Sequence, residues 1–266
     1  MSKTRLDVLL CEKGLSESRE KARAAIMSGI VFVDGNRALK PGTMVPEASA
    51  LEVRGGPTKF VSRGGFKLEK ALDFFDVSPA GKICIDCGAS TGGFTDCLLK
   101  RDAARVYAVD VGYGQLAWSV RSDPRVVTME RTNVRYLTPE QFPEKMRLAV
   151  VDVSFISLSL ILPAVRPLLT ADGELICLVK PQFEAGREKV GKKGVVRDGA
   201  THLEVLCNFM ENAEKTGFHI KSLTFSPIKG PEGNIEFLGH LTVGGEDAAV
   251  DAPGVVREAH SALDEQ

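Results

Sequence analysis

The spacing of apolar residues changes about 60 positions into the chain, and this change predicts two structural units. In the first unit, apolar residues share one face of two short helices, the first ending at Gly14 and the second at Gly29. Short strands follow around the tight turn Asp34-Gly35. In the second unit, apolar runs typical of strands cover residues 82–87, 105–110, 126–129, 147–152, 174–180, 219–225 and 234–242.

Helical spacings separate most of these strand patterns, notably over 66–75, 94–100, 158–169 and 199–215. Alternating strands and helices predict a mostly parallel sheet that is covered on both faces. The last two of the seven strands follow each other without a long helix. The pattern therefore favours an α/β fold with the Rossmann-like sheet of class I methyltransferases, preceded by a small α+β domain.

The predicted boundaries follow breaks in this pattern. Residues 1–58 are expected to form the small domain, which closes with a Gly- and Pro-containing break. Residues 59–65 are expected to link it to the larger domain, residues 66–245. The tail, residues 246–266, is rich in Asp, Glu and Ala, and we expect it to be disordered.

Composition narrows the class of protein. The 266 residues carry a net charge of −1, so the chain as a whole is not strongly basic. About three excess cations lie in the first sixty residues, and about five excess anions follow Gly245. The six cysteines lie mostly in apolar runs, which indicates free buried thiols and a cytoplasmic location. We expect no metal site, because Cys84-x-x-Cys87 has no second pair, and no membrane span, because no apolar run reaches ~20 residues.

The segment from Asp86 to Gly93 carries the most specific signal for a ligand site. It ends a buried strand pattern with small residues, which let the backbone approach a ligand closely. Asp110 follows the next strand, where a carboxylate accepts hydrogen bonds from the hydroxyls of a nucleoside ribose. A dehydrogenase prefers Gly-x-Gly-x-x-Gly in this loop, and Ser90 holds the middle position. A methyltransferase that binds S-adenosylmethionine tolerates this serine.

Two lysines and two carboxylates are expected to meet at one edge of the sheet. Asp152 and Lys180 end the fourth and fifth strand patterns, Glu236 lies in the last one, and Lys67 precedes the first. A charged residue in an apolar strand is costly unless it is paired or lies at an open end. The four residues are therefore either strand-end ion pairs or a group capable of proton transfer, in which neighbouring ammonium groups depress each other's pKa.

The whole arrangement resembles the TlyA group of proteins, also called haemolysin-like, over residues 3–243. This group joins an RNA-binding domain of the small-subunit ribosomal-protein type to an FtsJ-like ribose 2′-O-methyltransferase domain. The matching motifs include Ser62-Arg63-Gly64-Gly65-Phe66-Lys67, Asp86 to Gly93, Val109-Asp110-Val111-Gly112, Asp152-Val153-Ser154-Phe155 and Asn234-Ile235-Glu236-Phe237. One departure is Phe60, where characterised relatives have a tryptophan, and this leaves the role of the linker open.

The resemblance implies methylation of cytidine 2′-hydroxyls in 16S or 23S ribosomal RNA, or in both, with S-adenosylmethionine as cofactor. It implies that Lys67, Asp152, Lys180 and Glu236 form the catalytic group, and we expect Lys180 to act as the base, with Lys67 lowering its pKa. Residues expected to bind the cofactor are Asp86, Gly88, Ala89, Ser90, Thr91, Gly92, Gly93, Phe94, Asp110, Val111, Asn133 and Asp152. Residues expected to bind ribosomal RNA or ribosomal subunits are Lys3, Arg5, Ser18, Arg19, Lys21, Arg23, Arg63, Lys192 and Lys193. Lys192 and Lys193 belong to a basic loop over residues 186–194, in which we expect a flap.

Other functions of such a sheet are judged by what the sequence lacks. Methylation of base amino groups usually goes with an Asn/Asp-Pro-Pro-aromatic turn, and the segment after the fourth strand begins Asp152-Val153 instead. Methylation of cytosine carbon 5 needs a cysteine near the strand ends, and Cys177 lies inside its strand pattern. A non-catalytic RNA-binding assembly factor, a membrane-active haemolysin and a dehydrogenase are the remaining alternatives. The sequence leaves the modified nucleotide and the oligomeric state open.

Overall fold

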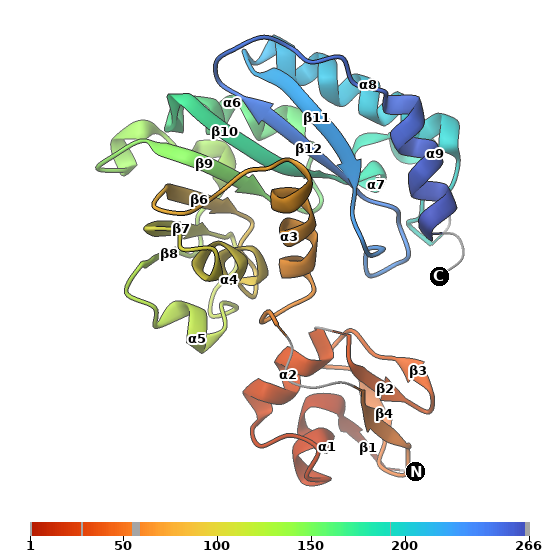
Figure 1. Cartoon of the computed structure of the whole chain (residues 1–266). Helices are drawn as coiled ribbons and strands as arrows, with labels where there is room; N and C mark the ends of the chain where they lie inside the picture. The colour runs from red at the N-terminus through yellow and green to blue at the C-terminus, as the bar shows by residue number, and fades with distance from the viewer. Residues whose placement is uncertain (1, 28, 55–58, 192, 264–266) are drawn as a thin grey trace.

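The computed structural model describes residues 2–27, 29–54, 59–191 and 193–263. In Figure 1 a small N-terminal domain lies beside a larger domain. The small domain consists of β1 Lys3–Arg5, α1 Leu6–Glu12, α2 Arg19–Met27, β2 Val31–Val33, β3 Asn36–Arg37, β4 Met44–Pro46 and β5 Leu51–Val53. β1 pairs with β4, and β2 pairs with β3 and β5, all antiparallel. The sequence pattern does not predict β1 and β4, because each has only three residues and no more than one of them is buried.

A seven-stranded sheet forms the centre of the larger domain and confirms the predicted α/β fold. Its strands are β6 Ile83–Cys87, β7 Arg105–Val109, β8 Val126–Met129, β9 Met146–Val151, β10 Leu169–Val179, β11 His219–Phe225 and β12 Phe237–Thr242. Their spatial order is β11-β12-β10-β9-β6-β7-β8. β12 runs antiparallel to both of its neighbours, and the other pairs are parallel. The chain order reverses between β6 and β9, and ligands of such sheets bind outside the carboxyl ends of the strands at this point.

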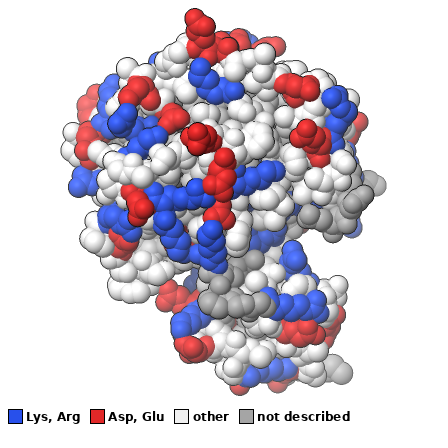
Figure 2. Space-filling view, in the orientation of Figure 1, with Lys and Arg blue, Asp and Glu red and all other residues white. Residues whose placement is uncertain are grey.

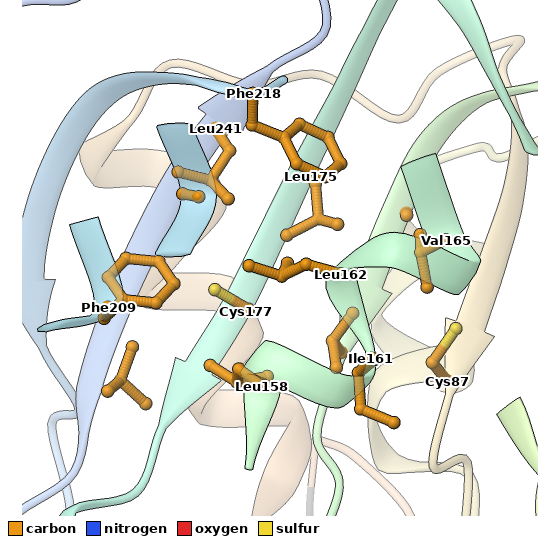
Figure 3. Packing of buried hydrophobic residues seen from close by; sticks show 14 of the residues in the cluster. Cys87, Leu158, Ile161, Leu162, Val165, Leu175, Cys177, Phe209, Phe218 and Leu241 are labelled. Atoms are coloured by element: carbon orange, nitrogen blue, oxygen red, sulfur yellow. The ribbon is translucent and has the colours of Figure 1, made fainter. Parts of the chain in front are cut away.

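Helices cover both faces of the sheet. They are α3 Gly64–Phe74, α4 Gly93–Lys100, α5 Trp118–Arg121, α6 Leu162–Val165, α7 Pro181–Glu184, α8 Gly199–Lys215 and α9 Ala252–Leu263. Short 3-10 turns are η1 Val134–Tyr136, η2 Pro139–Gln141, η3 Leu158–Leu160, η4 Arg166–Leu168 and η5 Arg187–Lys189. Leu68 of α3 and Leu98 of α4 pack on one face. Leu162 of α6 and Phe209 of α8 pack on the other face, around Cys177 of β10 (Figure 3).

The continuous helix predicted over residues 158–169 is wrong. The segment consists of η3, α6 and η4, and Leu169 already pairs with β9. Pro163 and Pro167 account for the breaks, because proline has no N–H to donate to the preceding turn. Leu158 and Leu162 are nevertheless buried, so the apolar spacing identified the correct face of the segment.

The prediction of a disordered tail over residues 246–266 is also wrong for the part that the structure describes. Residues Ala252–Leu263 form α9, which packs against α8 and β11 (Figure 1). Ala252, Val256, Ala259 and Leu263 are buried. These positions are spaced by three or four residues, as on one face of a helix. The acidic composition of the tail hid this periodicity.

The alternation of side chains along the strands places the charged residues of the site on one face. Leu178 of β10 and Val150 of β9 belong to the cluster that packs against α3 and α4. Lys180 and Asp152 lie two positions further along, and successive strand residues point to opposite faces. Both therefore continue rows on the face covered by α3, at the carboxyl ends of their strands. Glu236 lies one residue before β12, on the same side.

Candidate active site

The loop between β6 and α4 brings its backbone into contact with the end of β9. Gly88 has a φ of +93°, and a Cβ atom there would lie 2.4 Å from the carbonyl oxygen of Asp152. Only glycine fits so close an approach. The N–H of Gly88 donates to the carbonyl of Val109 at 2.9 Å, so the loop is held between β7 and β9. Ser90, in the same loop, is exposed and has a φ of +48°.

Asp86 lies under this loop as the penultimate residue of β6 and is fully buried. Its Oδ2 accepts a hydrogen bond from Thr95 Oγ1 at 2.6 Å. Within the described part of the chain, its Oδ1 has no hydrogen-bond partner. Burial raises the pKa of Asp86 to about 7, against the opposing effect of the bond from Thr95. A buried carboxylate oxygen without a donor can accept from a ligand N–H or ammonium group.

Asp110 follows β7 and joins two loops. Its Oδ2 accepts from the N–H of Ser90 at 2.8 Å, and its Oδ1 accepts from the N–H of Gly112 at 2.7 Å. Each oxygen keeps a second lone pair that can accept from a ribose hydroxyl. Val111 beside it is 68% exposed. Asn133, after β8, is exposed and caps η1 with its side-chain oxygen.

The four charged residues form two ion pairs at the carboxyl ends of the strands. Nζ of Lys67, on α3, lies 2.5 Å from Oε2 of Glu236. Nζ of Lys180 lies 2.5 Å from Oδ1 of Asp152. Lys67, Lys180 and Glu236 are 7%, 8% and 1% exposed. Each lysine is thus held by a carboxylate in a place with little access to water.

We expect the two ammonium groups to depress each other's pKa, but the pKa of Lys67 is shifted in the opposite direction. Burial lowers the pKa of Lys67, but the carboxylates of Glu236 and Asp152 outweigh burial and raise it above its ordinary value. The expectation is therefore wrong for Lys67. Burial raises the pKa of Asp152, but Lys180 and Lys67 outweigh it and lower that pKa overall. At neutral pH Lys67 is a fixed cation and Asp152 a fixed anion.

Two further side chains hold Lys180 and its surroundings in place. Ser154 Oγ accepts a hydrogen bond from Nζ of Lys180 at 3.0 Å. Glu184 of α7 accepts from Ser157 Oγ at 2.6 Å and from the N–H of Leu158 at 2.8 Å. Glu184 therefore ties the loop after β9 to the end of β10. Sequence reasoning missed both residues, although Ser154 lies three residues after β9, within the motif Asp152-Val153-Ser154-Phe155.

A cleft opens between these groups and the small domain. The predicted site residues that line it are Arg63, Lys67, Gly88, Ala89, Ser90, Thr91, Gly93, Phe94 and Asp152. Asp110, Val111 and Asn133 lie outside this lining, at the ends of β7 and β8. Asp86, Gly92, Lys180 and Glu236 also lie outside it. Met27 and Leu39 of the small domain also line the cleft, which no sequence pattern indicates.

The residues predicted to bind RNA are mostly exposed: Lys3, Arg5, Ser18, Arg19, Lys21, Arg23 and Lys193. Asp7 is fully buried and pairs with Arg5 at 2.9 Å and with Arg19 at 3.0 Å, so it holds these two cations side by side. Arg63 is partly buried, and its guanidinium donates to the carbonyl of Lys229 at 2.8 Å. Lys192 lies outside the described residues.

Polar contacts join the small domain to both sides of the cleft. Glu20 on α2 accepts a hydrogen bond from the N–H of Trp118 at 2.9 Å. Lys40 forms an ion pair with Glu232 at 3.0 Å, in the loop before β12. Lys and Arg side chains flank the junction of the two domains in Figure 2.

Neither a metal site nor a membrane-spanning helix is present among the described residues. Cys84 and Cys87 are buried free thiols. Residues 2–27, 29–54, 59–191 and 193–263 hold no group of three or more His, Cys, Asp or Glu side chains that is arranged for a metal ion. None of the helices described is both long and apolar enough to cross a membrane.

Known proteins share both parts of this architecture. The FtsJ-like methyltransferase model matches residues 60–242, and the S4 domain model matches residues 4–49. The chain is 55% identical to YqxC of Bacillus subtilis (strain 168), over 99% of this chain and 96% of that protein. It is 45% identical to the 16S/23S rRNA (cytidine-2′-O)-methyltransferase TlyA of Mycobacterium tuberculosis (strain ATCC 25618 / H37Rv), over 99% of this chain and 98% of that one. A solved hemolysin-like structure from Streptococcus thermophilus has a TM-score of 0.79 and 46% identity, covering 100% of this chain and 98% of that chain.

Proposed function

Because this chain belongs to the TlyA group of FtsJ-like methyltransferases, we propose that it methylates the 2′-hydroxyl of cytidine in ribosomal RNA, using S-adenosylmethionine. The observation that carries the proposal is the pair of ion pairs Lys67–Glu236 and Lys180–Asp152 beside the glycine-rich loop. The Mycobacterium tuberculosis relative is named for this activity on both 16S and 23S rRNA. The S4 domain supports RNA in a ribosomal subunit as the substrate.

The residues around the loop fit S-adenosylmethionine. Asp86 offers its free Oδ1 to the ammonium group of the methionine part, and Gly88 allows the backbone to approach it. Asp110 lies where ribose hydroxyls are bound in such sheets, with lone pairs available on both oxygens. The cofactor supplies an electrophilic methyl group on a sulfonium. The protein's tasks are to bind the RNA ribose, to orient it and to accept its proton.

Lys180 is the proposed general base. A ribose hydroxyl is a poor nucleophile until its proton is removed, and a positioned base contributes about 10²–10⁴-fold to the rate. In its neutral form, the amine of Lys180 would accept the hydroxyl proton as the methyl group passes to the ribose oxygen; the methyl–sulfur bond breaks and the donor leaves as the neutral thioether. Asp152 and Ser154, which contact Nζ of Lys180 in the structure, would hold the ammonium that results.

Lys67 has a different role in this proposal. Its pKa is raised, so it keeps its proton and serves as a donor to oxygens of the bound nucleotide. Glu236 fixes the position of this ammonium group at 2.5 Å. Fixed donors cost no reorganisation when the reaction takes place, and this lowers the barrier.

Single-turnover methylation by Lys180→Ala tests the proposal. The substrate is ribosomal subunits from cells that lack this gene, with radiolabelled S-adenosylmethionine. We expect methyl transfer to fall at least about 100-fold, because the base is removed. Binding of S-adenosylmethionine, measured by calorimetry, should stay within about threefold of the parent, because the donor contacts at Asp86 and Asp110 remain.

Lys215→Ala is the matched control, since Lys215 pairs with Glu211 on the exposed surface of α8 and does not line the cleft. It should methylate at the parent rate. A Lys180→Ala rate within a few-fold of the parent would remove Lys180 from the mechanism. Absence of methyl transfer by the parent protein on either subunit would instead favour a non-catalytic assembly factor.

A further inference from the structure

A second groove runs along the junction of the two domains. One wall is α2 of the small domain, and the other is the segment 114–121, which includes α5. The groove offers about 800 Å³ of space and is partly open to solvent. The hydrogen bond from the N–H of Trp118 to Glu20 joins its two walls.

The lining of this groove is basic, whereas the whole chain is not. It contains four cationic residues, Arg19, Lys21, Arg23 and Arg121, and one carboxylate, Glu20, which is an excess of three cations. The whole chain has a net charge of −1. Arg19, Lys21 and Arg121 have carboxylate partners outside the lining. Arg23 is exposed and makes no ion pair within the described ranges, so its charge is available to a phosphate.

Trp118 gives the groove an aromatic surface. This residue is 64% exposed, although its ring is large and apolar. It is the one tryptophan of the chain. A ring held open to solvent beside arginines has the composition of sites that stack unpaired bases and neutralise the backbone. The small domain, in contrast, has no exposed aromatic ring among residues 2–27 and 29–54.

The groove is continuous with the cleft beside Lys67 and the glycine-rich loop (the donor cleft), because Met27 and Thr91 line both. We propose that this groove holds an unpaired segment of the RNA substrate, with a base stacked on Trp118 and a phosphate on Arg23. The inference rests on the proposed function and adds to it the path by which RNA reaches the methyl donor. An RNA strand bound along this path would run from α2 past the glycine-rich loop.

Fluorescence of Trp118 tests this inference directly, because no other tryptophan contributes to the signal. The full-length protein is titrated with protein-free ribosomal RNA from cells that lack this gene. We expect saturable quenching of the emission, with a midpoint equal to the Kd from filter binding. Trp118→Ala should bind the RNA about tenfold more weakly, whereas Trp118→Phe, which keeps a ring, should stay within about threefold.

Charge is tested with a matched pair of variants. Arg23→Gln should reduce the slope of log Kd against log salt by about one. Arg257→Gln removes an exposed charge on α9, outside the lining of the groove. It should leave the slope unchanged. Calorimetry with S-adenosylmethionine should show unchanged donor affinity for all four variants.

Unchanged emission at saturating RNA, or parent-like RNA affinity for Trp118→Ala, would overturn the proposal. Neither result touches the methylation assay, so the groove and the proposed function fail separately. If quenching and the affinity losses occur but the parent transfers no methyl group, the groove stands and the activity does not.

Discussion

We expect Asp86 to make binding of the methyl donor dependent on pH. Its pKa is raised to about 7 by burial, so a large part of it is protonated just below neutrality. An ammonium group on the donor needs the ionised form. We therefore expect the affinity for S-adenosylmethionine to rise about tenfold between about pH 6 and pH 7.5. Calorimetry at the two pH values measures it, and Asp86→Asn should abolish the difference.

The same residue affects stability in the opposite direction. A carboxyl group whose pKa is raised by folding favours the folded state while it is protonated, and this contribution is lost as pH rises from its ordinary range through about 7. Asp86→Asn should thus raise the stability of the ligand-free protein above pH 7 and change it little near pH 4. Urea unfolding at both pH values decides the matter. Equal changes at both would contradict the assigned pKa.

The buried pair Lys67–Glu236 allows stability and activity to be separated. Both side chains are almost inaccessible, so Glu236→Ala leaves a buried ammonium without its carboxylate. We expect a loss of about 3–5 kcal/mol in the free energy of unfolding. The double variant Lys67→Met/Glu236→Leu should regain most of this stability while methyl transfer stays lost. Recovery of methyl transfer together with stability would show that the pair is structural only.

At the scale of elements, α9 offers a test of the corrected tail. Ala259 is fully buried on its inner face, and Glu258 is exposed beside it. Ala259→Asp places a carboxyl group in the core and should destabilise the protein by about 2–4 kcal/mol, measured by urea unfolding. Glu258→Ala should change stability by less than about 0.5 kcal/mol. If neither variant matters, α9 contributes nothing to the fold in solution.

The elements also show what sequence patterns predict well. All seven strands of the large sheet were predictable, because buried strands are apolar runs bounded by polar residues. The convergence of Asp152, Lys180 and Glu236 followed from their positions at strand ends, and that of Lys67 from its helix just before the first strand. The contacts that position them did not follow: Ser154 beside Lys180 depends on loop geometry, which no periodicity encodes.

Pairing between lysines and carboxylates was equally hidden from the sequence. Four charges at one edge allow several pairings, and only the positions in space select Lys67–Glu236 and Lys180–Asp152. The pKa of Lys67 is raised because this arrangement places the carboxylates of Glu236 and Asp152 near it. The contribution of Met27 and Leu39 to the cleft depends on how the domains are placed, which apolar spacing inside each domain does not determine.

At the scale of the whole molecule, the two ligands should respond differently to salt. The chain has almost no net charge, so we expect local cations such as Arg5 and Arg19, which Asp7 holds together, to attract RNA. Raising NaCl from about 0.1 to 0.3 M should weaken RNA binding at least about tenfold through counterion effects. Donor affinity should change less than about twofold. Filter binding and calorimetry on the same sample compare the two.

The walls of the donor cleft come from both domains, with Met27 and Leu39 facing Lys67 and the glycine-rich loop. The small N-terminal domain is therefore part of the cleft and cannot be exchanged without changing the cleft. A chimaera in which another RNA-binding domain replaces residues 1–54 would lack one wall of this cleft. Retargeting such an enzyme requires grafting those two side chains along with the new specificity.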